Sequence, residues 1–95
     1  MSPTRYTVIA TDEAADHLAS LWLNYPRDRN QITRASSTLE GCLRYDPLPQ
    51  GTPVVPPRQP PRWYLDRLPL RVYYEVSEPD RLVTLVEYEY LPAIP

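Results

Sequence analysis

The sequence has too few cysteines and histidines to staple the fold or to bind a metal. Cys42 and His17 are the only residues of their kinds among 95, which excludes an internal disulfide and a structural zinc site. No apolar run approaches the roughly 18 residues that cross a membrane, and the first 15 residues lack the basic and then apolar layout of a secretion signal. We therefore expect a cytoplasmic protein that has no metal or cofactor and does not contact a membrane.

Lysine and phenylalanine are absent, and glycine occurs only twice. All ten cations are arginines, which favour bidentate contacts with carboxylate or phosphate, although a GC-rich coding sequence produces the same bias. The 12 acidic residues bring the formal charge to -2, so direct binding to nucleic acid is not expected. A chain this short buries one core, which predicts a single domain over residues 1–95.

Proline is abundant where these other residues are scarce. Of 13 prolines, seven lie within residues 47–61. Asp46 precedes the first of them, and a residue before proline is pushed away from helical backbone angles. We therefore predict a stiff, extended connector over residues 47–61.

Hydrophobic periodicity predicts a strand and then a helix at the start of the chain. Residues 5–10 alternate and are rich in β-branched side chains, which is typical of a short strand. Thr11 can cap a helix over residues 12–23. The apolar stripe of this helix includes Leu18 and Trp22, which we place in the core.

A second amphipathic helix is predicted over residues 28–45. Asp28 and Gln31 form a capping pair at its start. Its apolar face carries Leu39, a predicted core residue, and Cys42, which we interpret as a small packing residue rather than a reactive thiol. The two helices make an antiparallel hairpin.

The second half of the chain predicts three strands, at residues 62–66, 70–76 and 81–90. The last two form a hairpin closed by a short acidic turn, with Val72 and Val86 directed into the core. The order of strand, two helices and three strands indicates an α+β fold (β-α-α-β-β-β). We expect the helix hairpin to pack on a small, mainly antiparallel, curved sheet.

Three stretches follow this order and carry a family resemblance: YTVIATDEAADHLASLWL, then LRYDPLPQG, then PLRVYYEVSEPDRLVTLVEY. The first stretch is an opening strand followed by an amphipathic helix. In the second, the sequence Asp-Pro ends the second helix. The third is a hairpin rich in Val and Tyr. In these features the chain resembles the RelE/ParE superfamily of bacterial type II toxins over most of residues 6–90. The Pro-rich connector departs from the family pattern.

The resemblance has consequences for catalysis. In the RNA-cleaving members, the resemblance implies that the catalytic residues are Arg, Lys and a Tyr or His. These lie on the open sheet face and near the C-terminus. Arg71 matches the Arg of the central strand and is a weak catalytic candidate, but Glu87 and Glu89 stand where those enzymes place cations. Carboxylates oppose a negatively charged transition state, so the catalytic set looks incomplete and enzymatic activity is uncertain. The resemblance then points to a toxin with a protein target such as gyrase, or to a member that has lost toxicity.

An antitoxin is the partner that the resemblance implies, and its acidic side chains could pair with arginines on the open face. Residues 58–71 carry a net charge of +3 and residues 75–89 a net charge of -4. Neutralisation between neighbouring strands is the simplest interpretation, while a phosphate site or a surface for an acidic partner are alternatives. The candidate binding surface consists of Arg62, Arg67, Arg71, Tyr73 and Tyr88.

Two hypotheses from different classes remain open. One is a toxin that binds its target, or cuts it as a ribosome-dependent mRNA endonuclease. The other is a noncatalytic interaction domain of the same fold, which would use Arg71, Tyr73 and the connector. The connector contains two copies of Pro-x-x-Pro-x-Arg, a pattern found in ligands of polyproline-binding grooves. His17 follows Glu13 by four residues, and we interpret the two as a surface helix pair.

Overall fold

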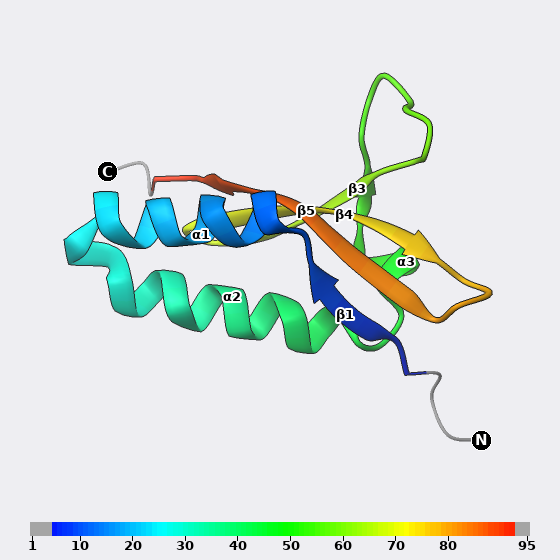
Figure 1. Cartoon of the computed structure of the whole chain (residues 1–95), viewed down its shortest axis with the longest axis horizontal. Coiled ribbons are helices and arrows are strands. Elements are labelled where there is room, and N and C mark those ends of the chain that lie inside the picture. Colours follow the sequence, from blue (N-terminus) through cyan, green and yellow to red (C-terminus); the bar gives the residue numbers. More distant parts are fainter. Residues whose placement is uncertain (1–4, 93–95) are drawn as a thin grey trace.

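The computed structural model describes residues 5–92, in which two long helices pack side by side against a five-stranded sheet (Figure 1). The elements in chain order are β1 (Thr7–Ala10), α1 (Asp12–Asn24), η1 (Pro26–Asp28, a 3-10 turn), α2 (Arg29–Leu43), α3 (Pro47–Gln50), β2 (Thr52–Pro53), β3 (Trp63–Arg67), β4 (Leu70–Ser77) and β5 (Leu82–Tyr90).

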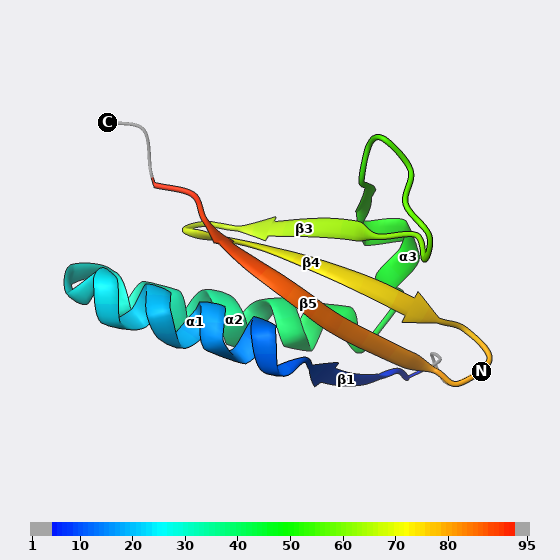
Figure 2. The same cartoon turned by 45° about the horizontal axis from the view of Figure 1, so that its top comes forward.

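The strands lie in the order β1-β5-β4-β3-β2. Only β1 and β5 run parallel, and the other neighbours are antiparallel. Figure 2 shows both long helices on one side of the sheet. The predicted α+β fold, with a helix hairpin on a mainly antiparallel sheet, is confirmed. Within residues 5–92 no helix is both long and apolar enough to cross a lipid bilayer.

Helix α1 begins as its sequence predicts, but it buries less than expected. The side chain of Thr11 accepts a hydrogen bond from the backbone N–H of Ala14 at 3.1 Å, which caps the first turn. Leu18 is half-buried against the core. The placement of Trp22 in the core is wrong, because it lies at the border of the apolar stripe and keeps 41% of its surface exposed. There the guanidinium of Arg29 covers its ring at 4.1 Å.

The turn between the helices is stabilised by contacts with the last strand, β5, and not by the predicted local cap. Asp28 makes no side-chain capping bond to α2. Its carboxylate accepts a hydrogen bond from the hydroxyl of Tyr90, at the end of β5. The ring of Tyr90 also stacks on Tyr25, with centroids 3.8 Å apart. The last strand is thereby tied to the helix hairpin, and the predicted pairing of Asp28 with Gln31 is wrong.

The prolines predicted an extended connector over residues 47–61. The structure instead shows a short helix at its start. Pro47 starts the short helix α3, where its missing N–H costs nothing. Gln50 then donates its side-chain amide to the carbonyl oxygens of Cys42 and Tyr45, at 3.0 and 2.6 Å, which covers the end of α2. After β2, residues 54–61 form an exposed loop that projects from the body (Figure 1).

The core lies between the helices and the sheet. Leu39 and Val72 are buried in it, as predicted. Tyr74 points inward and is fully buried, while Tyr73 stands on the opposite face of β4. The core residues are Tyr6, Ala14, Ile32, Ala35, Leu39, Leu43, Leu70, Val72, Tyr74, Val83, Leu85 and Tyr88.

A bulge in β5 changes which side chains face the helices. Tyr73 pairs with Glu87, whereas the next residue, Tyr74, pairs with Leu85, so Val86 is the extra residue of β5. In a regular strand the side chains alternate between the two faces, so Glu87 would face the core like Leu85. Because of the bulge, Glu87 faces away from the core and Tyr88 faces it. The placement of Val86 in the core is therefore wrong: it is half-buried and lies on the side away from the helices.

Two buried tyrosines allow a matched test of how much a buried, hydrogen-bonded hydroxyl contributes to stability. The hydroxyl of Tyr74 donates to the backbone carbonyl of Pro47 at 2.6 Å, while the buried hydroxyl of Tyr88 has no partner among the described residues. Because Tyr74→Phe leaves a buried carbonyl unsatisfied, we expect it to lower the free energy of unfolding by about 1–3 kcal/mol. Tyr88→Phe should change it little. Urea unfolding of both variants measures the difference, and equal losses would contradict the assignment.

Candidate functional site

The face of the sheet that the helices leave uncovered gathers most of the predicted functional side chains. We call it the open face. It is formed by alternate residues of β3, β4 and β5, and the bulge in β5 shifts the alternation so that two glutamates join it. Its residues are Tyr64, Asp66, Arg71, Tyr73, Glu75, Val86, Glu87 and Glu89.

Arg71 occupies the middle of the open face and is engaged on three sides. Its guanidinium donates to both carboxylate oxygens of Asp66, at 2.7 and 3.0 Å. A second acid, Glu89, lies 3.9 Å away, and the centre of the Tyr64 ring lies 4.2 Å from the guanidinium carbon. The hydrogen bonds that Arg71 donates to Asp66 raise the pKa of Arg71 above its ordinary value. The arginine is therefore a fixed and neutralised cation.

A second pair closes the open face toward the projecting loop. Arg62 donates to Glu75 at 3.0 Å, and both side chains are about a quarter exposed. Arg62 with Glu75 and Arg71 with Glu89 join residues 58–71 to residues 75–89, so the prediction that neighbouring segments neutralise one another is confirmed at these two pairs.

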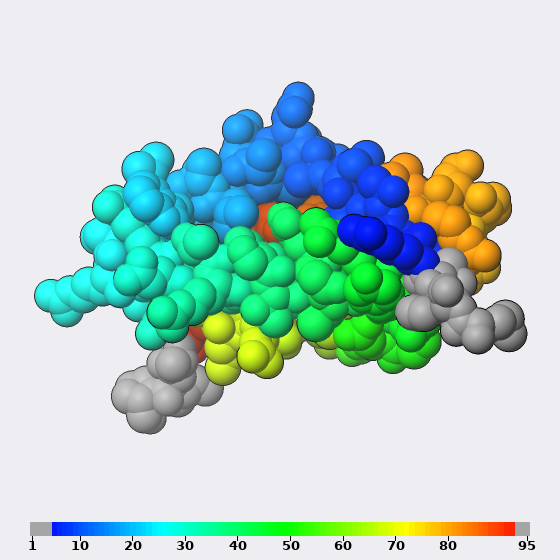
Figure 3. Space-filling model, turned by 90° about the horizontal axis from the view of Figure 1, so that it is seen from below, coloured from blue at the N-terminus to red at the C-terminus, as the bar shows by residue number. Residues whose placement is uncertain are grey.

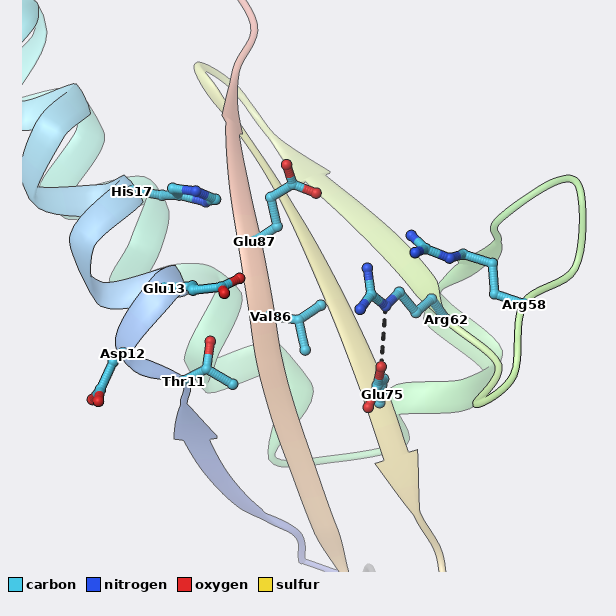
Figure 4. Close-up of a pocket in the computed structure, with 9 residues that line it drawn as sticks. All are labelled: Thr11, Asp12, Glu13, His17, Arg58, Arg62, Glu75, Val86 and Glu87. Carbon is cyan, nitrogen blue, oxygen red and sulfur yellow. Dashed lines mark hydrogen bonds and ion pairs between the residues drawn. The ribbon is translucent and has the colours of Figure 1, made fainter.

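A groove of about 590 Å³ runs along the open face between α1 and the projecting loop. Figure 4 shows Glu13 and His17 on one side, and Arg58 and Arg62 on the other. Its two arginines and four carboxylates leave a net charge of -2 when His17 is neutral. The groove is lined by Thr11, Asp12, Glu13, His17, Arg58, Arg62, Glu75, Val86 and Glu87.

His17 does not form the predicted surface pair. In the described part of the chain, no ion pair joins it to Glu13, and its buried Nδ1 atom has no hydrogen-bond partner. No group of three or more His, Cys, Asp or Glu side chains within residues 5–92 is arranged to hold a metal ion.

The structure brings three of the five predicted surface residues together: Arg62, Arg71 and Tyr73. Arg67 lies elsewhere, beside α2 in a second groove that Arg34 also lines. The reason is its register, because Arg67 pairs with inward-facing Leu70. The placement of Arg67 on the open face is thus wrong.

Tyr88 is also misplaced by the sequence interpretation. It keeps only 5% of its surface exposed and packs in the core. The bulge at Val86 shifts the alternation of β5 by one residue, which turns Tyr88 toward the helices. A bulge of this kind leaves no clear local signal in the sequence.

The sequence analysis did not predict which carboxylates pair with the arginines. One of these pairs, Asp66 with Arg71, could have been predicted from the sequence. Asp66 pairs with Arg71 because β3 and β4 are joined by a two-residue turn at Leu68 and Pro69. Counting outward from that turn places Asp66 directly across from Arg71. Glu75 and Arg62 had no such signal, because Arg62 lies outside the strands.

Comparisons with known proteins bear on the fold. No protein-family model matches the sequence, and no curated protein matches it. Among solved structures, the chain is similar to a chain of the toxin-antitoxin complex RelBE2 from Mycobacterium tuberculosis, with a TM-score of 0.69 and 23% sequence identity. The similarity covers 90% of this chain and 98% of the other. The chain therefore shares the fold of that chain of RelBE2 over most of its length.

Proposed function

We propose that this chain is the toxin-like component of a bacterial type II toxin-antitoxin system, a single cytoplasmic domain that acts through a protein target and is neutralised by an antitoxin. The proposal combines the RelE-like fold with one observation on the open face. That observation is the engagement of Arg71 by Asp66 and Glu89. A target such as gyrase would suit this mode of action, in the manner of ParE.

The arrangement of charge disfavours RNA cleavage. A scissile phosphate at Arg71 would have to displace Asp66 and would then face Glu89 and Glu87. Cleavage requires cations that stabilise the developing negative charge, and nearby carboxylates oppose it. Arg62 cannot substitute, because it already pairs with Glu75.

The same surface suits a protein partner. Tyr64 and Tyr73 face each other across β3 and β4, with ring centroids 6.0 Å apart. Arg71 adds its guanidinium above Tyr64. Tyrosine and arginine are enriched among the residues that dominate binding energy at protein interfaces. A carboxylate from a partner can replace Asp66 at Arg71 without leaving a buried charge unpaired, because Asp66 is partly exposed.

Coexpression with the product of a neighbouring gene tests the proposal. We expect the two proteins to copurify, and we expect Arg71→Glu to raise the dissociation constant by at least roughly tenfold, because it sets a third acid among Asp66 and Glu89. Arg34→Glu makes the same charge change on exposed α2, away from the open face, and should leave binding nearly unchanged. Equal losses, or no partner at all, would favour the interaction-domain hypothesis or a member of this fold that has lost toxicity.

A further inference from the structure

The groove on the open face has two sides of opposite charge. Arg58, on the projecting loop, makes no ion pair in the described part of the chain, and neither do Glu13 of α1 and Glu87 of β5. Arg62 and Glu75, by contrast, neutralise each other. Figure 4 shows Glu13 and Glu87 on the side of α1 and β5, with Arg58 on the other side. Charges of opposite sign therefore face the groove from its two sides without partners.

The bulge in β5 places one of these charges. In a regular strand Val86 and Glu87 would face opposite sides of the sheet, but because of the bulge both line the groove. Val86 is half-buried and gives the floor an apolar side chain, while Glu87 is exposed beside it. Bulges are over-represented next to active sites, where they redirect a side chain. Here the bulge adds a carboxylate to the side of the groove on which Glu13 lies.

The open face is also the side from which a partner can reach the strands. On the opposite side α1 and α2 cover the sheet, and Figure 3 shows only a little of β5 between them. The groove on the open face has a volume of about 590 Å³, which lies within the range of pockets that hold small ligands. A few residues of an extended chain can therefore occupy it.

An extended segment can reach both sides of the groove with neighbouring residues. Successive side chains of an extended chain point in opposite directions. A segment that runs along the groove therefore directs every second residue toward Glu13 and Glu87, and the residues between them toward Arg58. The whole lining has a net charge of -2 when His17 is neutral, so the basic residues of a complementary segment outnumber its acidic residues.

We propose that this groove binds an extended segment of a partner protein in which two basic residues flank one acidic residue. The basic side chains pair with Glu13 and Glu87, and the acidic side chain pairs with Arg58. The inference rests on the proposed function, because the partner is the protein that binds the open face, and it adds the charge pattern of the bound segment. A wholly acidic segment would be repelled by the excess of carboxylates in the groove.

Short peptides test the inference on the intact chain. The probe is a capped, fluorescently labelled peptide of about nine residues, uncharged except for a central Lys-Glu-Lys, which is long enough to span the groove when extended. Binding is measured by fluorescence anisotropy at low salt. We expect this peptide to bind roughly tenfold more tightly than one with Glu-Lys-Glu at its centre. It should also bind more tightly than a Lys-Lys-Glu peptide of the same composition, because only the alternating order reaches both sides.

Charge changes on each side of the groove locate the binding. Glu87→Lys should raise the dissociation constant of the Lys-Glu-Lys peptide roughly fivefold, because it replaces an attraction by a repulsion. Glu78→Lys makes the same change at an exposed position outside the groove and should have little effect. The wild type should prefer Lys-Glu-Lys to Lys-Ser-Lys, and Arg58→Ser should lose this preference, because the acidic residue then has no partner.

Three outcomes would overturn the inference: no binding of the Lys-Glu-Lys peptide, equal affinity for Lys-Glu-Lys and Glu-Lys-Glu, or equal effects of Glu87→Lys and Glu78→Lys. Its failure is distinguishable from failure of the proposed function. If the copurified partner is lost with Arg71→Glu but retained with Glu87→Lys, the open face binds a partner and the charge pattern proposed here is wrong. If no partner copurifies, the proposed function fails, and the peptides still measure the charge preference of the groove.

Discussion

Replacing Gly51 by alanine is expected to lower the free energy of unfolding by about 3 kcal/mol or more. A Cβ at this position would collide with the hydroxyl of Tyr74 and would lie 2.9 Å from its Cζ and 3.0 Å from Cβ of Trp63. Tyr74 cannot move aside cheaply, because it is fully buried and its hydroxyl is bonded to Pro47. The backbone of Gly51 is ordinary, with φ of -83°, so the cost arises from the close approach alone.

The other glycine of the chain provides the control. Gly41 lies within α2, and a Cβ there would have nothing within 4 Å. Gly41→Ala should therefore stabilise the protein by about 0.5–1 kcal/mol through helix propensity. In a Tyr74→Phe background, Gly51→Ala should cost less than in the wild type, because the colliding hydroxyl is gone. Chemical unfolding of the four variants decides the matter: a Gly51→Ala protein as stable as Gly41→Ala would refute the packing argument.

Removing the acids of the open face is expected to create an RNA-binding surface. The wild type should bind RNA weakly and leave ribosome-bound messenger uncut, because Arg71 and Arg62 are both paired. The triple variant Asp66→Asn, Glu87→Gln and Glu89→Gln frees Arg71 and removes three negative charges. We expect its affinity for a short single-stranded RNA to rise roughly tenfold to a hundredfold at low salt, and to fall steeply as salt is added.

The matched control removes the same charge at positions away from the open face, with Asp16→Asn, Asp46→Asn and Glu78→Gln. Because the net charge of the two triple variants is identical, a gain confined to the first depends on the position of the charges. Filter binding or fluorescence anisotropy at several salt concentrations measures the effect. Equal gains in both would show that only net charge matters, and codon-dependent cleavage by the wild type that is lost in Arg71→Ala would contradict the proposed function.

Stability and function meet at the contact between α3 and β4. The bond from Tyr74 to Pro47 anchors α3 against the core, and Gly51 allows the chain to pass that anchor closely. The chain then enters β2 and the projecting loop, whose Arg58 lines one wall of the groove on the open face. The Gly51→Ala variant should therefore also disturb the placement of Arg58.

Short-range chemistry in the sequence determined the local elements. The cap at Thr11 and the burial of Leu39 and Val72 follow from contacts within a few residues and from hydrophobic periodicity. The same alternation correctly placed Val72 in the core and Tyr73 on the opposite face of β4. The order of these elements was sufficient to predict the α+β fold class, and the chain shares its fold with a chain of the RelBE2 complex.

Only the tertiary structure decided which side chains meet across the sheet. The bulge at Val86 follows from the pairing of β4 with β5, and it reversed the predicted positions of Val86 and Tyr88. Asp28 does not cap α2 as predicted, and its carboxylate instead accepts a hydrogen bond from Tyr90, which lies 62 residues away in the sequence. Periodicity within one segment cannot contain such information, because register and partners depend on how distant segments bury their apolar surfaces together.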